Sequence, residues 1–151
     1  MVRKEVLKFG VSQIDAGTRI GVGAYTKSKV ANSMPDKEQF TIEDSRSLDD
    51  VVYEICKMGS IPSFCTACYR AGRTGEVFMK VAKSKFVHNF CIPNAILTFK
   101  EYLLDYASEK TKEIGEKTMA AHIALFEGSE MHEKILKMLK RIEAGERDLR
   151  L

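Results

Sequence analysis

The stretch that decides the fold runs from Ser63 to Glu76, reads SFCTACYRAGRTGE, and is followed by a further cysteine at Cys91. Two residues separate Cys65 from Cys68, and 22 residues lie between Cys68 and Cys91. A Cys-x2-Cys turn places two thiolates on one metal ion or cluster, and a distant segment can supply a third thiolate ligand. Three cysteines leave one coordination position for a different ligand, so the pattern predicts a metal site at which ligands can exchange.

The composition predicts one ordinary folded domain without a nucleic-acid-binding or membrane-spanning part. The chain has 151 residues, of which 44% are hydrophobic and 30% charged. The 24 basic and 21 acidic residues are interspersed, and the net charge of +3 marks no basic face. The longest apolar runs, such as AAHIALF at residues 120–126, are too short to span a membrane, and the charged start leads into no signal-peptide core. We therefore expect a cytoplasmic protein.

Four cysteines in a cytosolic chain indicate metal binding or catalysis rather than disulfides. Cys56 stands apart from the other three, because it falls on the apolar stripe of a predicted helix, with Leu48, Val51, Val52 and Ile55 at helical spacing. We interpret Cys56 as a small buried hydrophobic residue.

The first 60 residues are predicted to mix helix and strand. The expected elements are a helix ending at Gly10, a strand from Val11 to Ala16, a long loop from Gly17 to Phe40, and a helix from Leu48 to Met58 capped by Ser47 and stopped by Gly59. Long loops that follow strands in α/β folds often carry function.

The remaining residues are predicted to place the cysteines on loops braced by helices. A short helix is expected over Glu76–Ala82, and Thr98–Glu101 matches a capping box that would open the next helix. Two further helices follow, the last over about Glu130–Ala144 before Gly145. Its apolar stripe is interpreted as core or partner surface, with Met131, Ile135, Met138, Leu139 and Ile142.

Spacing alone does not decide which metal the cysteines bind. His88 precedes Cys91 by three residues, so Cys65, Cys68, His88 and Cys91 also form a plausible closed zinc site. An iron–sulfur cluster held by three cysteines fits the spacing equally well, and thiols without any metal are a third reading.

The wider sequence resembles one family, HydG, the radical S-adenosylmethionine tyrosine lyase that matures FeFe-hydrogenase. The matching segments are PSFCTACYR at 62–70, GRTGE at 72–76, FCIPNA at 90–95, LTFKEYL at 97–103 and DYAS at 105–108, with weaker ones at 10–14, 38–40 and 46–49. The resemblance covers at least Gly10 to about Gly115. A looser similarity extends to the biotin and thiamin synthesis associated region of biotin synthase and of the thiazole-forming tyrosine lyase.

The resemblance implies an α/β fold class, with the C-terminal end of a TIM-type radical SAM barrel followed by a mainly α-helical iron–sulfur cluster-binding domain. Residues 1–60 would be the barrel end and residues 61–151 the cluster domain. Cys65, Cys68 and Cys91 would hold an auxiliary 4Fe-4S cluster that carries an additional iron at its open site. S-adenosylmethionine and a second 4Fe-4S cluster are implied only for the complete enzyme.

The activity implied for the complete enzyme is cleavage of tyrosine to p-cresol and dehydroglycine, which yields carbon monoxide and cyanide ligands for the hydrogenase H-cluster. No Cys-x3-Cys-x2-Cys motif occurs in this chain. The chain alone is therefore expected to be inactive, and the implied partners are an N-terminal radical SAM half and the hydrogenase maturation machinery. The alternatives are a non-enzymatic Cys3His zinc module, a fragment like the thiazole-pathway lyase, and a decayed fragment without activity.

Residues outside the cysteine motif are weaker candidates. Thr18 and Arg19 fall where the resemblance implies the substrate end of the barrel, and Asp15 departs from the small hydroxyl residues usual there. Arg70 and Arg73 would either screen the negative charge of a cluster or brace the loop from the surface. Three tyrosines are interpreted as packing aromatics around the cluster loops: Tyr69, Tyr102 and Tyr106.

Overall fold

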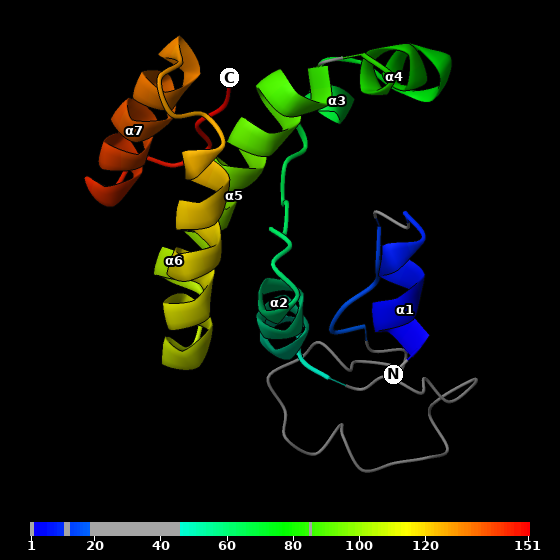
Figure 1. Cartoon of the computed structure of the whole chain (residues 1–151), viewed down its shortest axis with the longest axis vertical. Coiled ribbons are helices and arrows are strands. Elements are labelled where there is room, and N and C mark those ends of the chain that lie inside the picture. Colours follow the sequence, from blue (N-terminus) through cyan, green and yellow to red (C-terminus); the bar gives the residue numbers. More distant parts are fainter. Residues whose placement is uncertain (1, 11–12, 19–45, 85) are drawn as a thin grey trace. The chain divides into compact units, whose positions relative to one another are not determined.

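The described part of the chain is helical. The structure is a computed structural model that describes residues 2–10, 13–18, 46–84 and 86–151. Within these ranges it contains helices and irregular segments and no strand (Figure 1). The chain divides into two units, Met1–Val51 and Val52–Leu151, and the second holds all four cysteines.

The first unit contains α1 (Val2–Lys8), which ends before Gly10 as predicted, with that glycine at φ 93°. The predicted strand is wrong for its described part, because residues 13–16 lie in irregular backbone. A strand is stabilised by hydrogen bonds to a neighbouring strand, and the described residues provide none. The first two residues of that strand and residues 19–40 of the predicted loop lie outside the described ranges.

Helix α2 (Leu48–Lys57) confirms the predicted helix and its cap. The Ser47 hydroxyl accepts a hydrogen bond from the backbone N–H of Asp50 at 3.1 Å, which satisfies one of the free donors of the first turn. Gly59, at φ 75°, follows the end of the helix as predicted. The helix begins in the first unit and continues into the second.

Three short helices carry the cysteine region. Helix α4 (Gly75–Ala82) confirms the predicted short helix, and α3 (Ala67–Arg70) and the π-helix η3 (Val87–Cys91) accompany it. Cys68 lies in α3 and Cys91 ends η3, so the prediction that the cysteines sit on loops is wrong for these two and right for Cys65. A single turn is too short for an apolar period to reveal it in the sequence.

Helix α5 (Ile92–Asp105) begins six residues before the predicted capping box, which is therefore wrong. Thr98 lies inside the helix, where its hydroxyl donates to the carbonyl of Asn94 at 2.9 Å instead of capping a helix start. Pro93 sits in the first turn, where its missing N–H has no intrahelical acceptor to lose.

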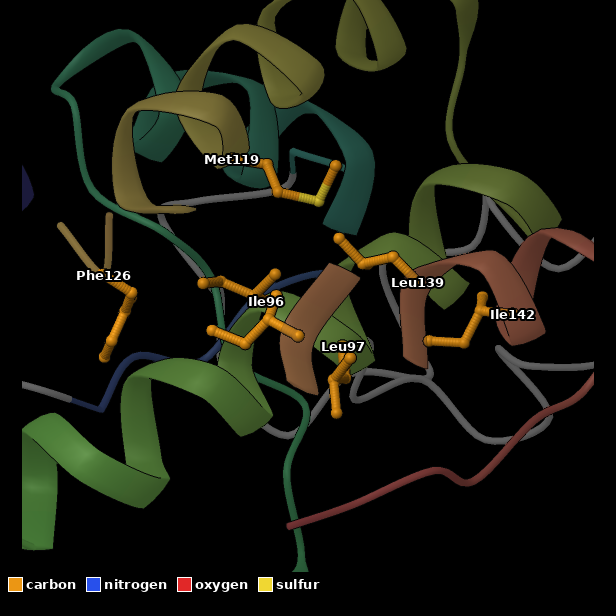
Figure 2. Close-up of a cluster of buried hydrophobic side chains, with 7 residues drawn as sticks. Ile96, Leu97, Met119, Phe126, Leu139 and Ile142 are labelled. Carbon is orange, nitrogen blue, oxygen red and sulfur yellow. The ribbon is translucent and has the colours of Figure 1, made fainter. Parts of the chain in front are cut away.

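Helices α6 (Glu109–Ala124) and α7 (Glu130–Glu143) both pack on α5. Figure 2 shows the buried cluster that joins the three helices. Its members are Ile96, Leu97, Met119, Phe126, Ile135, Leu139 and Ile142. The apolar stripe of α7 was predicted to be either core or a partner surface, and its buried residues belong to the core. Gly115 permits the close approach of α5 and α6, because a Cβ there would lie 2.6 Å from Leu103 Cδ2.

A second buried cluster joins α2 to α5 and consists of Val52, Cys56, Phe99, Tyr102 and Leu103. Cys56 is 3% exposed, which confirms its interpretation as a buried hydrophobic residue. No helix in the described ranges is long and apolar enough to cross a membrane.

An ion network and the C-terminal tail complete the second unit. The Lys100 ammonium of α5 lies 2.9 Å from Glu116 of α6 and 3.0 Å from Glu143 of α7, so one cation links three helices. Residues 145–151 return to α5, where Arg147 forms paired hydrogen bonds to Asp105 at 2.7 and 2.8 Å.

Candidate metal centre

The segment that carries Cys65 is fixed to α5 by a hydrogen bond and a ring contact. The backbone N–H of Phe64 donates to the Thr98 hydroxyl at 3.3 Å. The Phe64 ring stacks on Tyr102, with ring centres 4.8 Å apart and planes at 16°. Because Tyr102 is buried in the second cluster, these contacts connect the cysteine segment to the core.

Local hydrogen bonds shape the turn between Cys65 and Cys68. The backbone N–H of Cys65 donates to the Ser63 hydroxyl at 3.3 Å, and the N–H of Ala67 lies 3.5 Å from Cys65 Sγ. An N–H that donates to sulfur stabilises the thiolate form that binds metal. The turn then continues into α3, which holds Cys68.

Cys91 belongs to a later segment of the chain and lies at the junction of η3 and α5. A π-helical turn inside a longer helical run displaces the residues that follow it, and such turns are frequent at functional sites. The charges of Cys68 and Cys65 act on the Cys91 thiol, which indicates that the two segments lie near one another.

The environment of the Cys91 thiol includes the charges of the other two cysteines. Burial raises the pKa of Cys91, the charges of Cys68 and then Cys65 raise it further, and the charge of Arg73 opposes them. All four cysteines of the chain are free thiols. In the described residues as they stand, no three His, Cys, Asp or Glu side chains are close enough to hold a metal ion. Cysteine thiolates are nevertheless the soft ligands that iron–sulfur clusters and zinc prefer, so the chemistry of the three side chains fits such a group.

His88 does not join this group. Its ring packs against Phe126, with centres 4.8 Å apart and planes at 44°, and its Nδ1 lies 3.3 Å from the side-chain oxygen of Asn89. The side chain is exposed, and it is absent from the charges that act on the Cys91 thiol.

The two arginines that follow Cys68 have different surroundings. Arg70 is exposed, and its guanidinium pairs with the carboxylate of Asp148 at 2.5 Å. Arg73 is half-buried, and its guanidinium carbon lies 5.7 Å from the centre of the Phe86 ring. Arg70 thus braces the surface, as in one of its two predicted roles, whereas the charge of Arg73 acts on the Cys91 thiol.

Two of the three tyrosines predicted to pack around the site are largely exposed, although the Tyr106 ring contacts Tyr102 with centres 6.1 Å apart. Tyr69 is 68% exposed and Tyr106 is 77% exposed, whereas Tyr102 is buried. Tyr69 lies in the short helix α3, none of whose residues is buried. Tyr106 follows the end of α5. The sequence did not reveal the contacts of Phe64 with Thr98 and Tyr102 of α5, because the Thr98 pattern indicated a cap and no signal indicates a partner 34 residues away.

The residues predicted for the barrel mouth belong to the first unit. Asp15 and Thr18 are exposed in irregular backbone, and Arg19 lies outside the described residues. A role for Thr18 and Arg19 in substrate binding stays a prediction.

Comparison with known proteins identifies a solved relative. No protein-family model matches the chain, and no curated protein sequence matches it. Among solved structures, HydG, described as a maturase of the [FeFe]-hydrogenase, matches with 50% sequence identity and a TM-score of 0.86. The match covers 99% of this chain and 31% of the HydG chain, so the chain spans about a third of that relative's length. Identity at this level over nearly every residue means that the chain belongs to the HydG family and matches the C-terminal part of that maturase.

Proposed function

We propose that Cys65, Cys68 and Cys91 hold an auxiliary 4Fe-4S cluster. The observation that carries the proposal is the Cys-x2-Cys-x22-Cys pattern in a chain 50% identical to HydG, and the charges of Cys68 and Cys65 that act on the Cys91 thiol support it. The fourth cysteine, Cys56, lies in a separate buried cluster and is unsuited to complete the set. Three cysteine ligands leave one iron without a protein thiolate.

The residues around the three cysteines prepare them to bind. The N–H of Ala67 lies 3.5 Å from Cys65 Sγ, and the positive charge of Arg73 favours the thiolate of Cys91. Metal binding requires deprotonated thiols, and at Cys91 the charge of Arg73 opposes the rise in pKa that burial and the neighbouring thiols cause. When bound, the cluster would supply an iron position for exchangeable ligands and for an additional iron.

The function proposed for the complete protein is that of a radical SAM tyrosine lyase. It would cleave tyrosine to p-cresol and dehydroglycine and provide carbon monoxide and cyanide for the hydrogenase H-cluster. Its other cofactors would be S-adenosylmethionine and a second 4Fe-4S cluster, held by an N-terminal half that works with this chain. Since no Cys-x3-Cys-x2-Cys motif is present, the chain alone should not cleave tyrosine.

The proposed organisation follows from this function. Residues 1–60 would form the end of the radical SAM barrel, with Thr18 and Arg19 near the substrate, and residues 61–151 would form the cluster domain. The complete enzyme would act in the cytoplasm with the other hydrogenase maturation proteins. A thiazole-pathway lyase fragment is the alternative of the same class, and a zinc module is the alternative of a different class.

The test is to purify the chain without oxygen, reconstitute it with iron and sulfide, and measure metal content and the paramagnetic resonance of the reduced protein. We expect a 4Fe-4S signal that is lost in Cys65→Ala and kept in His88→Ala and in the control Cys56→Ala. The His88 result has a structural reason, because that ring packs on Phe126. Stoichiometric zinc that resists iron and is lost in His88→Ala would refute the proposal.

A further inference from the structure

Two arginines, three residues apart, follow Cys68 in the sequence. Within the part of the chain that the structure describes, Arg70 forms a salt bridge with a carboxylate and Arg73 forms none. The guanidinium of Arg70 pairs with Asp148, which raises the pKa of Arg70. Asp148 has a left-handed backbone with φ 59° and also contacts Arg150 at 3.3 Å. The charge of Arg70 is therefore balanced at the surface by the C-terminal tail.

Arg73 instead connects the two segments that carry the cysteines. Its backbone N–H donates to the carbonyl of Cys68 at 2.8 Å. Its guanidinium lies over the Phe86 ring, and Phe86 stacks on Phe90 with ring centres 4.5 Å apart. Phe90 directly precedes Cys91, so Arg73 contacts both halves of the three-cysteine motif.

The side chain of Arg73 carries a donor that the described protein does not satisfy. Its Nε is buried and has no hydrogen-bond partner among the described residues. Leaving a buried donor without an acceptor costs about 1–3 kcal/mol, and more for a charged group. The positive charge also acts on the Cys91 thiol, where it opposes the effect of the other two thiols. A cation whose buried Nε lacks an acceptor and whose charge acts on a cysteine thiol is suited to an anionic sulfur acceptor.

We propose that Arg73 is a positioning residue of the metal centre, whose guanidinium donates a hydrogen bond to a sulfur of the thiolate-bound cluster and offsets its negative charge. This inference rests on the proposed function, because the acceptor is part of the cluster. Hydrogen bonds to sulfur and net charge set the reduction potential of iron–sulfur clusters. Reduction adds negative charge, which a nearby cation stabilises, so Arg73 should raise the reduction potential.

The test compares Arg73→Met with Arg70→Met in the full chain after anaerobic reconstitution. Both changes remove one arginine from the segment that follows Cys68, and Arg70 serves as the matched control because its charge is balanced by Asp148. The measurements are the midpoint potential from a redox titration followed by paramagnetic resonance, and the rate at which a chelator removes iron. We expect Arg73→Met to lower the potential and to speed iron loss at least several-fold, with Arg70→Met close to the parent chain.

A second variant separates charge from folding. Arg73→Lys keeps the positive charge and should lie between the parent and Arg73→Met in potential, with helix content by circular dichroism unchanged in all variants. Equal potentials and equal iron loss in Arg73→Met and Arg70→Met would overturn the inference while leaving the cluster assignment intact. A parent chain that takes up zinc and no cluster would overturn the proposed function, and the inference with it.

Discussion

At the scale of single residues, the chain uses cysteine in two chemically different ways. Cys56 is buried against α5, and burial raises its pKa to about 11, while a hydrogen bond with Thr118 opposes the shift. The other three cysteines are only partly buried and lie near one another and near Arg73. A buried thiol held in the neutral form is a packing group, whereas accessible thiols near one another are potential ligands.

We predict that Cys56 resists alkylation in the folded chain. Raising the pKa from 9.0 to about 11 lowers the thiolate fraction at pH 8 by about 100-fold, before steric protection is counted. The measurement is the iodoacetamide reaction rate of a variant with Cys65, Cys68 and Cys91 changed to serine, with and without urea. Equal rates in the two conditions would contradict the burial of this side chain.

The same shift predicts a pH dependence of stability. The folded pKa lies above the unfolded value, so the contribution of Cys56 is complete below about pH 9 and is lost as the pH rises towards about 11. The loss of unfolding free energy over this range should therefore be smaller in Cys56→Ala than in the parent chain.

At the scale of elements, the C-terminal tail is bound to one face of α5. The side chain of Asn94, 4% exposed, accepts from the backbone N–H of Leu151 at 2.8 Å and donates to its carbonyl at 3.3 Å. Further along the helix, Glu101 accepts from the N–H of Leu149 at 3.4 Å, and Asp105 pairs with Arg147. These contacts join the last residues of the chain to the helix that Cys91 precedes.

We predict that Asn94→Ala lowers the free energy of unfolding by about 1–3 kcal/mol, because it leaves two polar groups of Leu151 without their partner. The measurement is urea denaturation of the chain without metal. Deleting Leu151 supplies the control, since the two changes remove the same contact. The double variant should lose less than the sum of the single variants, and additive losses would show that the two residues do not interact.

The sequence predicted helices wherever several local signals agreed. For α2, the Ser47 cap, the apolar stripe and Gly59 all indicated one helix, and for α7 the stripe and Gly145 did the same. The capping box at Thr98 failed because a threonine hydroxyl serves equally well inside a helix, bonded to a preceding carbonyl. The strand predicted before Gly17 failed over residues 13–16, since strand formation depends on a partner that a local pattern cannot supply.

At the scale of the whole molecule, the three-cysteine motif could be found from spacing because its ligands are defined by chemistry. The difference between Arg70 and Arg73 could not, because it depends on Asp148, 78 residues further along the chain. The comparison with HydG adds that nearly the whole chain corresponds to about a third of a longer maturase. The cysteine spacing thus indicates a candidate metal site, and contacts between distant parts of the chain decide which of the two arginines is available to it.

The distribution of contacts leads to a prediction about which part of the chain folds and binds metal. Both buried clusters and the three candidate ligands lie in the second unit, and Ser47 caps α2 from just before its first residue. A chain of residues 46–151 should therefore melt cooperatively within about 4 °C of the full chain, which corresponds to a loss of no more than about 1 kcal/mol. It should also take up the same amount of iron per molecule on reconstitution. Thermal melts followed by circular dichroism and iron assays provide the measurements, with a shorter chain that starts at Val52 as the control that removes the first turn of α2. If residues 46–151 melted without cooperativity or bound no iron, the second unit would need the first in order to fold, and the metal centre could not be assigned to the second unit alone.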